Sequence, residues 1–194
     1  MKKYLTIIVY TILILLVIKY SFTKQYDLFF DLAAAFILLI IFNLNFKHWN
    51  QNNISYFFLI LTLLLHNFHL YAAKPFGIPF DHYMHFIAGF TIALIFDRLL
   101  FELPIKKRFF LIIVAALGIG AVGEIAEWIG YSIFNAGEGF FFYGVGDEGE
   151  WRNATFDMIF NGIGGISAAF VLFFSKKQLE IKTSKLHKNY NKVQ

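Results

Sequence analysis

FFLIIVAALGIGAVGEIAEWIGYSIF, residues 109–134, is an apolar run long enough to cross a lipid bilayer as a helix. A helix needs about 20 residues to span the ~30 Å of hydrocarbon. The run is continuous rather than alternating, and a lipid-embedded segment must satisfy its own backbone hydrogen bonds, so a helix is favoured over a strand. Two acidic residues, Glu124 and Glu127, interrupt the run towards its C-terminal end.

Five further apolar windows accompany this run, and together they predict an all-α, polytopic transmembrane helical bundle of about six spans. Of 194 residues, 58% are hydrophobic and 15% are charged, and the mean hydropathy is +0.61. That balance is typical of a chain whose solvent is lipid. No small-x-small cleavage site follows the first window, so we expect it to be a retained span. The six predicted spans are Tyr4–Ile18, Leu28–Phe46, Ile54–Leu70, Tyr83–Phe101, Phe109–Phe134 and Ala154–Phe174.

Basic residues are unevenly distributed between the two sides of such a bundle. With the N-terminus inside, thirteen Lys and Arg residues fall in cytoplasmic segments and four in outer loops, which is a positive-inside bias. We therefore expect both termini in the cytoplasm, with residues 1–175 as the transmembrane domain and residues 176–194 as a basic tail. The orientation of the chain in the membrane explains where the lysines lie, so no nucleic-acid partner is expected. The expected location is the bacterial plasma membrane, with membrane lipids as partners.

Polar residues in the last three predicted spans recur at a matching depth. At 1.5 Å per residue, His85 lies ~6 Å below Asp81, Glu124 lies ~22 Å along its span, and Asp157 lies ~5 Å below the start of the last span. All of them fall near the outer side. Ionisable groups in hydrocarbon are costly and usually functional. The sequence thus predicts an outer-leaflet polar site, with further polar residues at Asn161, Asp147, His66 and His69.

The residue types and spacings suit a divalent metal ion. Glu124-x-x-Glu127 and Asp81-x-x-x-His85 each place two groups on one helix face, and carboxylates with a histidine suit a hard or borderline cation. The predicted ligands are His85, Asp81, Glu124, Glu127 and Asp157, with Glu124 or Glu127 as catalytic base. Without a metal, carboxylates at close range require a shared proton. Both interpretations stay open at this point.

Some polar residues and the glycines have structural explanations. Asp81 is either a site residue or the N-cap of its helix, and His82 fits a solvated position at the outer interface. Asp97 and Arg98 are expected to form an ion pair on the cytoplasmic side. Glycines in the last two spans are expected to permit close helix packing, namely Gly118, Gly120, Gly123, Gly130, Gly162, Gly164 and Gly165.

Several segments resemble a known family. Residues 80–90, FDHYMHFIAGF, are similar to the D-x-x-x-H-F-x-x-G-F segment of the YjdF-like bacterial inner-membrane proteins, and residues 124–128 to their E-x-x-E-W. The G-D and D-M pairs within 146–158 resemble their G-D…D-M segment, although residues 153–154 are Asn-Ala where Asp-Thr is usual. Residues 152–165 also resemble the R…D…N-x-x-G pattern of VanZ-like proteins. These resemblances imply a multi-helix membrane protein with a polar outer-leaflet site, and they imply no substrate.

Three functions are compatible with these residues. The first is a metal-dependent enzyme acting on a lipid or lipid-linked envelope substrate, although HExxH and a serine nucleophile signature are missing and the chain has no cysteine. The second is a non-catalytic envelope protein that binds a lipid head group or an ion. The third is a proton- or cation-coupled transporter, which the almost purely apolar inner halves of the last three spans disfavour. The sequence does not indicate an oligomeric state.

Overall fold

All regular structure in the described part of the chain is helical. The computed structural model describes residues 2–24, 28–68, 70, 73–134 and 147–190. The predicted all-α fold with six long helices is confirmed, and the short 3₁₀ helix η2 is an addition. In chain order the elements are α1 (Lys2–Thr23), α2 (Phe29–Asn45), α3 (Asn53–Asn67), η2 (Pro75–Gly77), α4 (Phe80–Leu99), α5 (Ile105–Phe134) and α6 (Asp147–Tyr190).

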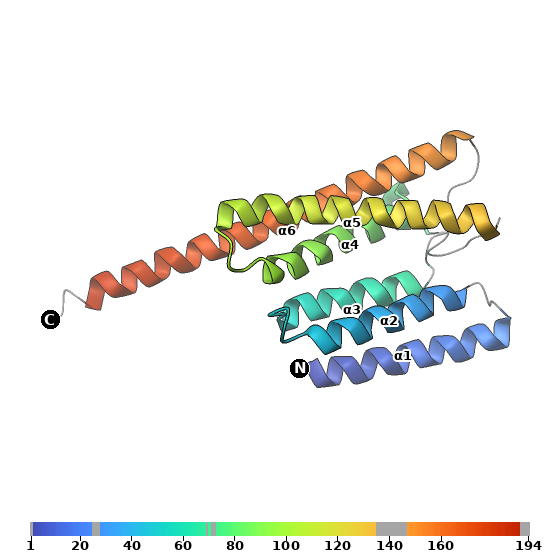
Figure 1. Ribbon diagram of the computed structural model, residues 1–194, viewed down its shortest axis with the longest axis horizontal. Coiled ribbons are helices and arrows are strands. Elements are labelled where there is room, and N and C mark those ends of the chain that lie inside the picture. The colour runs from blue at the N-terminus through green and yellow to red at the C-terminus, as the bar shows by residue number, and fades with distance from the viewer. Residues whose placement is uncertain (1, 25–27, 69, 71–72, 135–146, 191–194) are drawn as a thin grey trace.

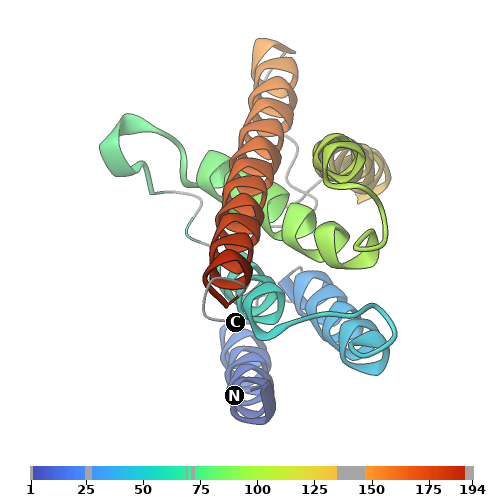
Figure 2. The same cartoon turned by 90° about the vertical axis from the view of Figure 1, so that its left-hand side faces the viewer.

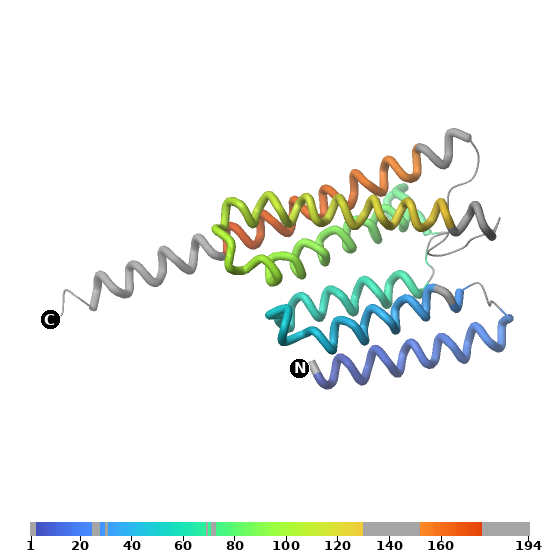
Figure 3. Tube along the Cα trace, viewed as in Figure 1, coloured from blue at the N-terminus to red at the C-terminus, as the bar shows by residue number. Residues whose placement is uncertain are grey.

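The six long helices form two layers of three. One layer holds α1, α2 and α3 side by side, and the other holds α4, α5 and α6 (Figure 1). Contacts between α3 and α4 join the layers, and the loop that carries η2 projects away from the bundle in the end view (Figure 2). Successive helices run in opposite directions (Figure 3). One end of the bundle therefore collects the ends of α3 and α5 and the starts of α4 and α6, and we call it the site end.

Within the described ranges, three helices are long and apolar enough to cross a membrane: α1 over Lys3–Thr23, α5 over Ile105–Ile129 and α6 over Arg152–Ser175. The apolar parts of α2 and α3 are shorter, and α4 is more polar because it carries the charged and histidine residues described below. Phe110 and Val122 are among many large apolar side chains that are exposed, as a lipid-facing surface requires. Helix α6 continues to Tyr190, so no helix end marks the predicted boundary between residues 175 and 176.

The first layer is held together by an apolar core and by hydrogen bonds near both of its ends. At the site end, Tyr20 Oη donates to the Asn67 carbonyl oxygen at 2.7 Å. Towards the opposite end, Thr6 Oγ1 and Tyr56 Oη lie 2.6 Å apart. These bonds link α1 with α3, the two helices that are furthest apart in sequence within the layer. The core itself includes Val9, Leu13, Leu32, Leu39, Tyr56 and Ile60.

In the second layer, glycines allow the backbones of α4 and α6 to touch. A Cβ atom on Gly89 would lie 2.9 Å from the Asn161 carbonyl carbon, and one on Gly164 would lie 2.9 Å from the Phe90 nitrogen. Helix α5 joins this contact, since a Cβ on Gly120 would lie 2.6 Å from Asn161 Nδ2. The expected packing role is thereby confirmed for these α5 and α6 glycines. The close approach fixes how the side chains of α4 and α6 face each other.

The packing expectation is wrong for two glycines of α5. A Cβ on Gly118 or Gly123 would have nothing within 4 Å, because these positions lie on helix faces that no neighbouring helix covers. Gly162 and Gly165 of α6 do approach α5, at Leu117 and Ala116 respectively. The surroundings of Gly130 are outside the described part of the structure, so its packing role stays a prediction.

A buried ion pair fixes the second layer at the end opposite the site end. Arg108 Nε lies 3.0 Å from Asp97 Oδ1, and both side chains are less than a tenth exposed. Arg98 instead donates from Nε to the Asn50 carbonyl oxygen at 2.8 Å. The expected ion pair between Asp97 and Arg98 is therefore wrong. Adjacent residues on a helix point about 100° apart, so these two side chains reach different neighbours.

Candidate metal centre

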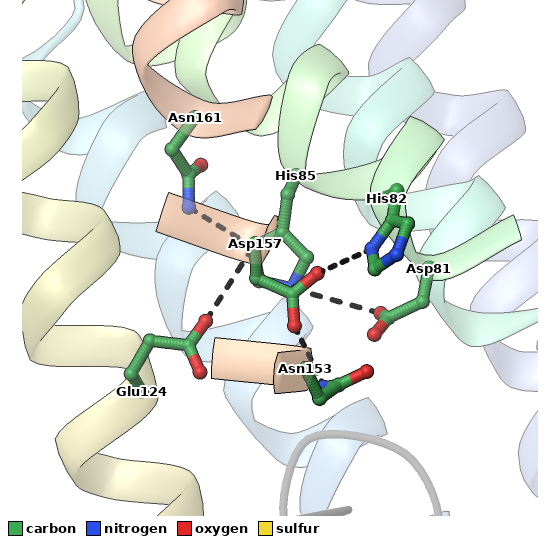
Figure 4. Close-up of polar contacts among 7 residues, drawn as sticks. All are labelled: Asp81, His82, His85, Glu124, Asn153, Asp157 and Asn161. Carbon is green, nitrogen blue, oxygen red and sulfur yellow. Dashed lines mark hydrogen bonds and ion pairs between the residues drawn. The ribbon is translucent and has the colours of Figure 1, made fainter. Parts of the chain in front are cut away.

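Seven polar side chains from three helices converge at the site end (Figure 4). Helix α4 supplies three from its first two turns, α5 supplies one from its second half, and α6 supplies three spaced four residues apart. Because α5 runs antiparallel to α4 and α6, these positions meet at one level. The residues are Asp81, His82, His85, Glu124, Asn153, Asp157 and Asn161.

Asp157 lies at the centre of this group and is completely buried. Its Oδ1 is 2.8 Å from His82 Nδ1 and 3.6 Å from His85 Nε2. Its Oδ2 accepts a hydrogen bond of 2.7 Å from Asn153 Nδ2, one turn earlier on the same face of α6. A carboxylate in a low-dielectric interior needs such partners, and here they also fix the direction of both oxygens.

His85 faces acidic oxygens with both ring nitrogens. Its Nε2 lies 3.6 Å from Oδ1 of Asp81 and 3.6 Å from Oδ1 of Asp157. Its Nδ1 lies 3.8 Å from Oε1 of Glu124 and 3.0 Å from Nδ2 of Asn161. Asn161 thus restrains the imidazole from α6 while the carboxylates surround it. The amide NH₂ only donates, so Nδ1 accepts from Asn161 while Nε2 faces Asp81 and Asp157. A cation on Nε2 would leave the imidazole proton on Nδ1, where the amide would present its oxygen instead, as the polar partner of a metal-ligating histidine does.

Glu124 is the least satisfied member of the group. The residue is 7% exposed, and neither of its carboxylate oxygens has a hydrogen-bond partner among the described residues. Figure 4 shows the carboxylate directed at His85 and Asp157. A buried acceptor without a donor costs about 1–3 kcal/mol. A cation bound between these residues would remove that cost.

Two groups of side chains have the composition and spacing for a metal ion. One is His85, Glu124 and Asp157, and the other is Asp81, His82 and Asp157; within each group the ligand atoms lie within 4.8 Å of one another. Ligands at ~2.1 Å from a shared cation lie roughly 3.0–3.5 Å apart, so the wider contacts must shorten by about 1–2 Å. His82 Nδ1 and Asp157 Oδ1, now 2.8 Å apart, must instead open slightly to take a cation between them. Mixed imidazole and carboxylate ligands suit Zn²⁺ or Mn²⁺.

Four predicted site residues are not among the seven residues of this cluster. Glu127 is half-buried, one turn beyond Glu124 on α5. His66 lies 3.7 Å from Asp31 of α2, in the first layer. His69 lies outside the described residues, and Asp147 begins α6 with its side chain outside them. The structure thus brings together Asp81, His85, Glu124, Asp157 and Asn161 and leaves His66 in a separate pair.

Two structural explanations offered by the sequence are wrong. The N-cap of α4 is Pro79, and Asp81 lies within the first turn without capping the helix. His82 is buried rather than solvated, at 8% exposure. Its ring packs against Phe156 and Phe160 of α6, with ring centroids 5.4 Å and 5.1 Å away. His82 is therefore part of the site.

Two polar residues were missed by the sequence analysis. Asn153 holds one oxygen of Asp157, and the four-residue spacing of Asn153, Asp157 and Asn161 is the signal that indicates it. Asp31 is 2% exposed and pairs with His66. The sequence feature that indicates Asp31 is the same as for the other acidic residues: a carboxylate inside an otherwise apolar span.

Fold and site together define an all-helical membrane protein with buried acidic and histidine residues at one end of its bundle. The family model described as a predicted membrane protein, DUF2238, matches residues 2–178, and the chain belongs to this family. The YjdF-like proteins are in the same family, so that resemblance is confirmed, whereas the comparisons give no support to a VanZ-like similarity. No curated protein and no solved structure matches the chain.

Proposed function

We propose that this membrane protein binds a divalent cation through His85, Glu124 and Asp157 and acts on a lipid or lipid-linked envelope substrate. The observation that carries the proposal is Glu124, a buried carboxylate with no hydrogen-bond partner among the described residues, directed at a histidine and a second buried carboxylate. A shared proton between Glu124 and Asp157 is the alternative.

Each neighbouring residue has a definite part in this function. Asn161 orients His85, while His82 and Asn153 orient Asp157, as the outer partners of metal ligands do. The bound cation would polarise a phosphoryl or acyl oxygen or activate a water molecule. Glu127, half-buried one turn beyond Glu124 and outside the ligand group, is then the candidate general base.

We place the site at the outer face of the bacterial plasma membrane. The distribution of Lys and Arg residues, thirteen against four, favours the end opposite the site as cytoplasmic. At the outer face the ligand cluster lies near the level of the lipid head groups. A phosphate or ester of a lipid or of a lipid-linked precursor can approach the site at that level.

Metal analysis of the protein purified in detergent tests the binding step. After loading with Zn²⁺ or Mn²⁺ and desalting, the wild type should retain at least one cation per chain, and His85→Ala and Glu124→Gln should retain less. His66→Ala is the matched control, because His66 is also partly buried at the site end and belongs to neither ligand group. The proposal is overturned if the wild type retains no cation, or if all variants retain as much as the wild type.

Incubation with a bacterial membrane lipid extract tests the catalytic step. Mass spectrometry should detect a lipid species that the metal-loaded wild type converts and Glu127→Gln does not, although this variant keeps its cation. Equal conversion by both proteins removes Glu127 from the reaction. If the loaded wild type converts nothing, catalysis is excluded for these lipids and the protein is assigned to the non-catalytic binding class.

A further inference from the structure

Asp157 belongs to both ligand groups, and its surroundings differ from those of a ligand to a single cation. The groups His85–Glu124–Asp157 and Asp81–His82–Asp157 share this one residue. In Figure 4 the Asp157 carboxylate lies between His82 on one side and Glu124 on the other. Oδ1 of Asp157 is the oxygen that lies near both histidines, 2.8 Å from His82 Nδ1 and 3.6 Å from His85 Nε2, while Oδ2 accepts from Asn153. One carboxylate oxygen has lone pairs for two cations. Asp157 is thus placed to bridge two cations.

The second group is as rigidly positioned as the first. The His82 ring packs against Phe156 and Phe160, and its Nδ1 lies 2.8 Å from Asp157 Oδ1. Asp81 lies one residue before His82 in the first turn of α4. Its Oδ1 is 3.6 Å from His85 Nε2, which places this carboxylate next to both groups. The second group therefore offers one imidazole and two carboxylates.

The charge of the site also exceeds what one cation can balance. Asp81, Glu124 and Asp157 are three acidic groups, and the ion pairs that they form with described residues are with histidines only. The basic side chain nearest in sequence, Arg152, lies over the Phe156 ring instead, at 5.8 Å. Uncompensated carboxylates in a low-dielectric interior are costly. Together with Glu127, four carboxylates match the charge of two divalent cations.

We propose that the site holds a pair of divalent cations bridged by Asp157, one bound by His85 and Glu124 and the other by His82 and Asp81. This inference rests on the proposed metal-binding function and adds the second cation and its ligands. The bridge sets the two cations about 3.5–4 Å apart, the spacing of two-metal sites that bind both oxygens of one substrate group. His82 is then a metal ligand and not only a partner of Asp157.

Manganese loading of the chelator-stripped protein in lipid nanodiscs tests this proposal. The wild type should bind two Mn²⁺ per chain, and its electron paramagnetic resonance spectrum should show an exchange-coupled pair. His82→Ala should bind one Mn²⁺ with an uncoupled spectrum, and Asp157→Asn should lose the coupling. His66→Ala, the matched control, should keep two coupled ions.

The outcomes separate the second cation from the first. A wild type that binds one uncoupled Mn²⁺ overturns the paired site and leaves the proposed function intact. A wild type that binds none overturns both. Two ions that stay coupled in His82→Ala remove His82 from the ligands and overturn the assignment of the second group. Thermal unfolding of each variant identifies any that fails to fold, and His82→Gln, which retains a polar side chain, then replaces His82→Ala.

Discussion

Replacing Gly164 by alanine should separate α4 from α6 and destabilise the protein. The added Cβ would lie 2.9 Å from the Phe90 nitrogen, 3.0 Å from the Phe86 carbonyl carbon and closer still to the Phe86 oxygen, whereas ordinary contacts begin at 3.4 Å. All of these atoms belong to the backbone, so no side-chain rotation relieves the overlap. The helices must move apart by at least about 0.5 Å, and overpacking of this kind costs about 1–3 kcal/mol.

Reversible unfolding in mixed micelles, followed by circular dichroism, measures this cost. Gly118→Ala is the matched control, because it makes the same chemical change in a neighbouring helix at a position with nothing within 4 Å. Its free energy of unfolding should not fall and should rise by up to about 1 kcal/mol, because alanine has a higher helix propensity than glycine. Equal effects of Gly164→Ala and Gly118→Ala would refute the backbone contact between α4 and α6.

A double substitution provides an internal check on the same contact. Gly89 faces the Asn161 backbone from the other side of the crossing, so Gly89→Ala alone should cost about as much as Gly164→Ala. Once one methyl group has pushed the helices apart, the other fits more easily. The double variant should therefore cost at least about 0.5 kcal/mol less than the sum of the single variants. Strict additivity would show that the two glycines do not share one contact.

Three further predictions follow from the site and from the opposite end of the bundle. Asn161→Ala, which frees the His85 ring, should lower Mn²⁺ affinity about 10–100-fold without removing a ligand, as measured by titration; unchanged affinity would contradict its orienting role. Chelation should lower the unfolding temperature of the metal-loaded wild type and lower that of Asp157→Asn by less, since a cation at 100 times its Kd stabilises by about 2.7 kcal/mol. Arg108→Met should cost about 3–5 kcal/mol by removing the cation beside buried Asp97, and adding Asp97→Leu should recover most of it in the same unfolding assay.

The helices were predictable because lipid imposes one strong rule on a chain. Every backbone polar group must be satisfied inside the apolar segment, so the length of each apolar run predicts a helix. The contact partners of each helix were less predictable. Gly120 and Gly164 face neighbouring backbones or side chains, whereas Gly118 and Gly123 do not, and only the rotation of each helix in the bundle distinguishes them.

The depth of the site was predictable, and the direction of its side chains was not. Counting residues from the span ends placed Glu124, His85 and Asp157 at one level, where the structure brings them together. Glu127 has a similar depth and, three residues after Glu124, lies on a neighbouring part of the same helix face, yet its carboxylate belongs to neither ligand group. The burial of His82 depends on two phenylalanines of α6, 74 and 78 residues later in the chain. No local pattern contains that information.

The glycine contact and the polar cluster together determine from which side the site can be reached. The cluster ends at His85 and Asn161, and directly beyond it Gly89 and Gly164 bring the two backbones together. From His85 to Asp97 helix α4 carries no other ionisable residue, a distance of about 18 Å, and the corresponding stretches of α5 and α6 lack them too. A cation that crossed the bundle along these helices would lose its ligands where the backbones already touch. This geometry favours a site that exchanges ions and substrate through the site end alone. Access from one side suits an enzyme or a binding protein, whereas a carrier needs access from both sides.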